Sequence, residues 1–296
     1  MKQKALFVGL TTIDIQYFID DIPVSNTKIK TDIPDILVGG PATNAAVAFA
    51  YLNKGATLAS PAGLNAFSSF IDQDLNSVGV DHFDLAYGQE FETILATVLT
   101  SNNGDRTIVT HNPKEIESTI SPQKLIDLSE PRLLLIDGFY PEFSLECAKI
   151  CKERGIMVVS DCGSWKPQFA ELLNYIDIAI CSADFMPPNC MSQKELFDFM
   201  LSKNVKSVAI SNGAGEIAYF SKGEKSSIKV PQIEIEDTLG AGDFLHGAFC
   251  YYFLIKAEFH SALAKAAELA SFTCKFKGTR KWLNFKHDAV LVENNA

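Results

Sequence analysis

One segment in the last quarter of the sequence combines small residues with a carboxylate. It reads DTLGAGD over residues 237–243 and runs directly into an apolar helical pattern. Gly240, Ala241 and Gly242 allow a ligand to approach the main chain closely. At a helix start the first N–H groups have no intrahelical partner, and together with the helix dipole they attract an anion. The segment therefore predicts an anion site with the carboxylate of Asp243 in the same helical turn.

Phosphoryl transfer is the chemistry that such an arrangement suits. The N–H groups would stabilise a negative phosphoryl group, and Asp243 would orient the attacking hydroxyl as a weak base. We expect the helix dipole to keep Asp243 ionised. A plain capped helix after a glycine-rich turn explains the segment equally well, with Asp243 only complementing the dipole. The segment alone leaves both interpretations open.

A second glycine pair stands near the N-terminus. Residues 39–46 read GGPATNAA, so Gly39 and Gly40 precede a helical pattern that carries Asn44 in its first turn. The glycines permit contact between the backbone and a ligand, and the Asn44 amide offers both a donor and an acceptor, which suits a sugar diol. Taken alone, a turn that starts a packing helix, with Asn44 as its cap, is the simpler interpretation.

The composition excludes some partners. The chain has 296 residues, a formal net charge of −10 and no block of Lys or Arg, so we expect neither nucleic acid nor an anionic membrane surface as a partner. The seven cysteines are scattered and form no CxxC pair, which favours free thiols in a reducing cytoplasm. No apolar run is long enough to predict a spanning helix or a signal peptide.

Apolar strands alternate with amphipathic helices along most of the chain, which predicts a mostly parallel sheet covered on both faces. The predicted strands are Lys4–Gly9, Thr57–Ser60, Arg132–Asp137, Ile156–Asp161, Ile176–Cys181 and Lys206–Ser211, with a closing antiparallel pair at Glu216–Phe220 and Ser227–Val230. The predicted helices are Pro41–Asn53, Ala66–Val78, Glu142–Arg154, Gln168–Asn174, Ser192–Lys203, Gly242–Ile255 and Glu258–Lys275.

Two further segments have the alternating pattern of strands that face solvent on one side. They cover about residues 12–38 and 88–112, and we expect them to form a small antiparallel β appendage. The second contains NNGD at residues 102–105 between two strand candidates, which is a hairpin turn signal.

Taken together, the two glycine segments carry a family resemblance. Gly39 and Gly40 with Asn44, and DTLGAGD at residues 237–243, look like the two signatures of the ribokinase-like (PfkB) carbohydrate kinase family. The resemblance covers nearly the whole chain. It implies an α/β fold, a ribokinase-like three-layer sandwich with a mostly parallel central sheet and a small β-strand lid. Residues 1–296 would form a single kinase domain, with the lid built from about 12–38 and 88–112 and excluding water from the site.

The resemblance also implies roles for matching residues. Asp243 would be the base, and Gly240, Ala241 and Gly242 would form the anion hole. The sugar would contact Asp14, Gly39, Gly40 and Asn44. The nucleotide would lie against the strand-and-glycine turn at residues 210–215, where its contacts would be Ser211, Gly213 and Gly215, together with Thr238, Gly240 and Gly242.

Within the family, two segments of the sequence resemble those of ketohexokinases and sulfofructose kinases. Arg106 lies in a GDRTIV segment similar to a lid strand of those enzymes, and Lys28 lies in a similar bend. Both are assigned to the substrate, although a solvated lysine and an ordinary strand arginine explain them equally well. Phe139 departs from the sulfofructose kinase pattern, which has an arginine near there. Arg280, after the last helix, fits either phosphate or substrate binding or a helix C-terminus.

The metal site departs from the family pattern. Many members carry Asn-x-x-Glu after the strand predicted at Ile176–Cys181, whereas this chain has Ser182 and Asp184 there. Mg²⁺ uses one or two carboxylates plus phosphates and keeps several waters, so no dedicated protein cage is needed. His246 follows Asp243 on the same helix side, where it could tune that carboxylate, but packing against a neighbouring helix is the expected role.

The resemblance implies an ATP-dependent sugar kinase that uses ATP and Mg²⁺. It would transfer the γ-phosphate to a hydroxymethyl group of a small, ketohexose- or ribose-like carbohydrate. Two alternatives stay open: a nucleoside kinase on the same fold, and a non-catalytic sugar-binding regulator. Unpaired edges of the lid strands would allow a homodimer.

Overall fold

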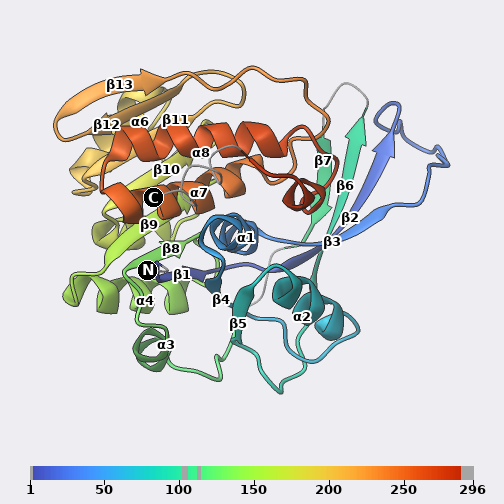
Figure 1. Ribbon diagram of the computed structural model, residues 1–296, viewed down its shortest axis with the longest axis horizontal. Helices are drawn as coiled ribbons and strands as arrows, with labels where there is room; N and C mark the ends of the chain where they lie inside the picture. Colours follow the sequence, from blue (N-terminus) through green and yellow to red (C-terminus); the bar gives the residue numbers. More distant parts are fainter. Residues whose placement is uncertain (1–2, 102–105, 112–114, 288–296) are drawn as a thin grey trace.

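The large sheet forms the middle of the molecule. The computed structural model describes residues 3–101, 106–111 and 115–287 (Figure 1). Among these residues, nine strands form this sheet in the order β13 (Glu224–Ile228), β12 (Ile217–Ser221), β11 (Ser207–Ser211), β10 (Ile178–Ser182), β9 (Met157–Cys162), β8 (Leu133–Ile136), β1 (Ala5–Val8), β4 (Ala56–Ser60) and β5 (Val80–Asp84). Neighbouring strands from β11 to β5 in this order are parallel, whereas β12 and β13 are antiparallel additions.

Helices cover both faces of this sheet. One face packs against α1 (Pro41–Asn53), α2 (Ser68–Ser77), α7 (Ala241–Lys256) and α8 (Phe259–Thr273). The other packs against α3 (Pro122–Ser129), α4 (Pro141–Glu153), α5 (Phe169–Leu172) and α6 (Gln193–Ser202). Successive strand residues such as Leu134 and Leu135 enter opposite cores, which is why these strands are apolar throughout. The predicted three-layer sandwich is confirmed.

A smaller sheet projects from one end of the large one (Figure 1). Its order is β3 (Asp35–Gly39), β2 (Thr12–Ile19), β6 (Ile94–Ser101) and β7 (Arg106–Thr110). The β2–β3 and β6–β7 pairs are antiparallel as expected, but β2 and β6 are parallel. The appendage is therefore a mixed sheet, and its two halves are separated in the chain by α1, β4, α2 and β5.

Helices α1 and α7 carry the two predicted signatures and pack backbone against backbone. A Cβ atom at Gly247 of α7 would lie 2.0 Å from the carbonyl oxygen of Ala45 on α1. Only a glycine fits at this contact without moving one of the helices. The close approach brings the first turn of α1 next to the first turn of α7.

Most predicted elements are present with small shifts at their ends, but β5 and α3 were not predicted. β5 is an edge strand with the polar sequence Val80-Asp81-His82-Phe83-Asp84, and α3 is a short helix capped by the Ser121 side chain. The predicted turn at residues 102–105 lies outside the described residues. No helix in the described ranges combines the length and the apolar run needed to cross a bilayer. All seven cysteines are free thiols.

Candidate active site

Helix α7 begins at the glycine-rich segment. Gly240 is the N-cap, and its φ of 75° is a left-handed conformation that favours glycine. A Cβ atom there would lie 3.1 Å from the Phe244 ring and 3.3 Å from the Asn44 amide nitrogen. No side chain caps this helix in the described chain. The Ala241 N–H donates to the Thr238 carbonyl oxygen at 3.2 Å, so the N–H groups that follow it in the first turn are the ones that can bind an anion. This geometry supports the predicted anion site at Gly240, Ala241 and Gly242.

The loop before α7 is anchored by Asp237. One carboxylate oxygen accepts hydrogen bonds from the Gln16 side chain at 2.8 Å and the Gly278 N–H at 2.9 Å, and the other accepts from the Leu239 N–H at 2.9 Å. The Gln16 amide also donates to the Thr100 hydroxyl at 3.0 Å. The buried side chain of Gln16 thus joins the small sheet to residues 237–242, here called the anion loop, a role that was not predicted from the sequence.

Asp14 lies on β2, over the glycine pair. A Cβ atom at Gly39 would lie 2.1 Å from its Oδ2 atom, so the missing side chain makes room for the carboxylate. The Thr12 hydroxyl donates a hydrogen bond to Asp14 at 2.7 Å. Burial raises the pKa of Asp14, while the Thr12 hydrogen bond and the Arg280 charge oppose this rise. The structure brings Asp14, Gly39 and the first turn of α1 together, as the resemblance implied.

Asn44 connects the two signatures. Its Nδ2 atom donates to Oδ2 of Asp243 at 2.9 Å, and its Oδ1 atom accepts from Arg280 at 3.0 Å. Arg280 also forms an ion pair with Asp74 on α2 at 3.0 Å and donates to the Val38 carbonyl at 2.9 Å. Arg280 is therefore part of the Asn44 and Asp243 cluster, rather than a cation at the end of a helix.

The charges around Asp243 raise its pKa. Burial and the neighbouring Asp161 carboxylate raise this pKa to about 7, with a smaller contribution from Asp14. The Asn44 hydrogen bond and the His246 charge act in the opposite direction. The helix dipole alone predicts an ionised carboxylate. The burial of Asp243 and the neighbouring Asp161 come from tertiary packing, which the local sequence does not reveal.

His246 packs against the large sheet, whereas we expected it to pack against a neighbouring helix. It lies close to the carbonyl oxygen of Ile180 on β10 and to the Asp161 carboxylate on β9. The two strands end next to the first turn of α7, so the ring fills the space between helix and sheet.

Another buried carboxylate, Asp137, follows β8. It accepts hydrogen bonds from the N–H groups of Leu10 at 2.8 Å, Ala42 at 3.2 Å and Phe139 at 3.0 Å. Burial raises its pKa to about 6. Asp137 thereby joins the end of β1 to the start of α1. Neither Asp137 nor Asp161 was assigned to the site from the sequence, although a polar residue at the carboxyl end of a buried parallel strand is a usable signal.

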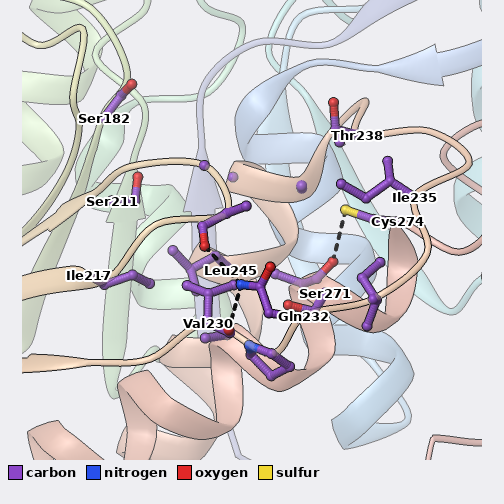
Figure 2. Close-up of a pocket in the computed structure, with 18 of the residues that line it drawn as sticks. Ser182, Ser211, Ile217, Val230, Gln232, Ile235, Thr238, Leu245, Ser271 and Cys274 are labelled. Carbon is purple, nitrogen blue, oxygen red and sulfur yellow. Dashed lines mark hydrogen bonds between the residues drawn. The ribbon is translucent and has the colours of Figure 1, made fainter. Parts of the chain in front are cut away.

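A pocket of about 400 Å³ opens beside the start of α7 (Figure 2). Thr238 lies on one side, opposite Ser182 and Ser211, while apolar side chains such as Ile217 and Leu245 form the walls. Six residues were predicted to bind the nucleotide. Four of them line this pocket, namely Ser211, Gly213, Thr238 and Gly242, whereas Gly215 and Gly240 do not.

The two basic residues assigned to the substrate lie elsewhere. Arg106 on β7 lines the pocket beside α7 and not the Asp14 cluster. Lys28 is exposed on the loop between β2 and β3 and does not line that pocket. Phe139, where the resemblance led us to expect an arginine, has the Lys166 ammonium group 4.2 Å from its ring centre.

The described residues offer few donors for a metal. They contain no group of three or more His, Cys, Asp or Glu side chains arranged to hold an ion. Ser182 and Asp184 do line the pocket and supply oxygen atoms. This donor set fits Mg²⁺ held mainly by phosphates and waters, with one protein carboxylate.

Comparisons with known proteins show the family and the fold. A family model described as pfkB family carbohydrate kinase matches residues 2–284. The chain is 25% identical to a nucleoside kinase of Methanocaldococcus jannaschii over 93% of this chain and 92% of that protein. It is 26% identical to a ribokinase of Lactococcus lactis, over 84% of this chain and 83% of the relative. A solved Arabidopsis thaliana ribokinase, complexed with ribose and ATP, superposes with a TM-score of 0.75 at 24% identity, covering 97% of this chain and 100% of that structure.

Proposed function

Since the chain belongs to the pfkB family of carbohydrate kinases, we propose that it transfers the γ-phosphoryl group of ATP to a hydroxymethyl group of a small sugar. One observation carries the proposal. The Asp243 carboxylate lies in the first turn of α7, 2.9 Å from the Asn44 amide, between the anion loop and Asp14. A hydroxyl held by Asp14 and Asn44 would therefore meet a base and an anion site together.

The residues perform the transfer by position and charge. Asp243 accepts the proton of the sugar hydroxyl while the new oxygen–phosphorus bond forms and the bond to the departing ADP oxygen breaks. The N–H groups at Gly242 and its neighbours stabilise the charge on the transferring group. Mg²⁺, when bound, neutralises charge on the phosphates. Ser182 and Asp184 are the residues that would hold it in the pocket.

The pocket beside α7 is the proposed site of ATP. Its walls are apolar near Ile217 and Val230 and would accept a flat base, and its other end meets the first turn of α7 at Ala241 and Gly242. The small sheet is the proposed lid of a single kinase domain, because its inner face carries Asp14 and Gln16, which contact the site. Arg106 would then reach the nucleotide from the lid.

A nucleoside kinase on the same fold is the second candidate. The match to the Methanocaldococcus jannaschii nucleoside kinase covers nearly the whole chain. The two candidates differ in the acceptor, because a nucleoside needs room for its base.

One screen tests the function. ATP consumption is measured with Mg²⁺ over a panel of ketohexoses, ribose, deoxyribose and nucleosides, with the Asp243→Asn variant in parallel. We expect the unaltered enzyme to consume ATP with a sugar, and the Asp243→Asn variant to lose this turnover. Turnover restricted to nucleosides would select the second candidate, and binding of a sugar without turnover would indicate a non-catalytic regulator.

The proposed partners are the sugar, ATP and a second copy of the chain. The outer face of the small sheet, away from Asp14, exposes the apolar residues Ile36, Leu95 and Val109, and nearby loop residues Val24 and Ile33 are exposed as well. Pairing of two such faces would form a homodimer. The seven free cysteines support a cytoplasmic location, where thiols stay reduced.

A further inference from the structure

His246 lies behind the proposed base, with both ring nitrogens next to oxygen atoms. Its Nδ1 atom is 2.6 Å from the carbonyl oxygen of Gly242, and its Nε2 atom is 3.1 Å from the carbonyl oxygen of Ile180. The Nε2 atom is also 3.5 Å from Oδ1 of Asp161. Only 5% of the residue is exposed, so water does not compete for these contacts.

These contacts decide the protonation of the ring. A carbonyl oxygen only accepts hydrogen bonds, and a neutral imidazole has one N–H and one bare nitrogen. A neutral His246 would therefore place a nitrogen lone pair against one of the two carbonyl oxygens, in a buried site where an unmade hydrogen bond is costly. The imidazolium form donates at both nitrogens, and the Asp161 carboxylate supplies the opposite charge.

We propose that His246 is a buried imidazolium that acts as a positioning residue for Asp243. The proposal rests on the proposed role of Asp243 as the base. The hydrogen bond to Gly242 fixes a carbonyl group in the first turn of α7, and the bond to Ile180 ties that turn to β10. The positive charge offsets Asp161, which otherwise opposes ionisation of Asp243.

Several elements bring charge to this place. Asp243 lies one turn before His246 on α7, Asp161 comes from β9, and β10 contributes backbone carbonyls and a thiol. Helix α1 brings the neutral amide of Asn44. The titratable groups that act on this cluster are Asp14, Asp137, Asp161, Asp243 and the Cys162 and Cys181 thiols, and the cations are Lys166 beside Asp137 and Arg280 beside Asp14. The carboxylates outnumber these cations, so a cation at His246 is what the surroundings favour.

The first test reads the ring directly. Nitrogen-15 NMR of the histidine-labelled protein at pH 7.5 reports the protonation of the five histidines, and the spectrum of His246→Gln assigns the signal of His246. We expect both of its ring nitrogens to carry a proton. A neutral tautomer would overturn the proposal. This readout is independent of kinase activity, so its failure is separable from a failure of the proposed function.

The second test uses the pH dependence of kcat. His246→Gln keeps a hydrogen-bond donor but removes the positive charge that favours ionised Asp243. The fall of kcat on the acidic side of the pH profile should therefore move about one pH unit higher. Asp161→Asn removes a neighbouring negative charge, so this fall should move lower. His260→Gln is the control, because His260 contacts Tyr219 at the surface. If both test variants lost activity equally at every pH, the role of His246 would be structural alone and the proposal would fail.

Discussion

Asn44 and Asp243 join the first turns of α1 and α7. A single hydrogen bond of 2.9 Å joins them across 199 positions of sequence. Asn44 is itself oriented by Arg280, which Asp74 holds in turn. Each side chain thus has its direction set by a neighbour, so the proposed base does not depend on substrate for its placement.

Replacement of the base should separate binding from turnover. Asp243→Asn keeps the shape of the side chain, and we expect kcat to fall by about 10²-fold or more, while sugar and ATP still bind. Asp198→Asn, at an exposed position on α6, is the matched control and should leave kcat unchanged. Steady-state kinetics and calorimetric binding measure the two effects. Near-normal turnover in Asp243→Asn would remove it from the role of base.

The pH profile should show the raised pKa of Asp243. The base must be ionised to accept a proton, and burial with Asp161 raises its pKa to about 7. We therefore expect kcat to fall as the pH is lowered through about 7, because the carboxylate becomes protonated. The measurement is kcat from pH 5.5 to 9 at saturating substrate. A profile flat down to pH 5.5 would show that Asp243 stays ionised there.

Asp14 should act on the sugar and not on the nucleotide. Asp14→Asn removes a charge-assisted hydrogen bond to a hydroxyl, so the KM for the sugar should rise about tenfold or more. The KM for ATP should change little. Asp81→Asn, at an exposed position on β5, is the control and should leave both KM values unchanged. An unchanged sugar KM would exclude Asp14 from the acceptor site.

At the scale of elements, the local sequence predicted the features that depend on neighbouring residues alone. The pattern of apolar residues predicted most strands and helices. The glycine segments predicted Asp243 and Asn44 as site residues, since each motif lies within one turn of chain. Asp137 and Asp161 were missed as site residues because each is one carboxylate at a strand end. Their partners, the N–H of Leu10 and the ring of His246, come from distant elements. The raised pKa of Asp243 was not predicted for the same reason, because it depends on burial and on Asp161 from another element.

The contact between α1 and α7 should be sensitive to one methyl group. In Gly247→Ala the new Cβ atom would meet the Ala45 carbonyl oxygen at 2.0 Å, so the helices must separate. We expect the free energy of unfolding to fall by about 1–3 kcal/mol. In Gly163→Ala the new atom meets its nearest neighbour at 3.6 Å, and stability should change by less than about 0.5 kcal/mol. Urea denaturation measures both, and equal stabilities would contradict the packing argument.

At the scale of the whole molecule, the small sheet has two different faces. Asp14 and Gln16 are buried on the inner face, whereas Ile36 and Val109 are exposed on the outer one. The inner face is joined to the anion loop through Gln16 and Asp237. Movement of this sheet would therefore be felt at the start of α7, and contact with a second copy would restrict that movement.

The proposed dimer should depend on the outer face. Ile36→Lys combined with Val109→Lys places two charges on it. We expect this variant to sediment as a monomer in analytical ultracentrifugation, and the unaltered chain to sediment as a dimer. Leu128→Lys, at an exposed site on α3, is the control and should leave the mass unchanged. A dimer that persists in the double variant would place the interface elsewhere.

The carboxylates around the acceptor site also bear on what happens after the transfer. A phosphorylated sugar carries about two negative charges at neutral pH, and the carboxylates of Asp14 and Asp161 are close enough to act on Asp243, the proposed base. The product would thus be repelled by Asp14, which is proposed to hold the uncharged substrate, and by its acidic neighbours. We expect weak product inhibition and fast release, so that the enzyme would keep working as the sugar phosphate accumulates.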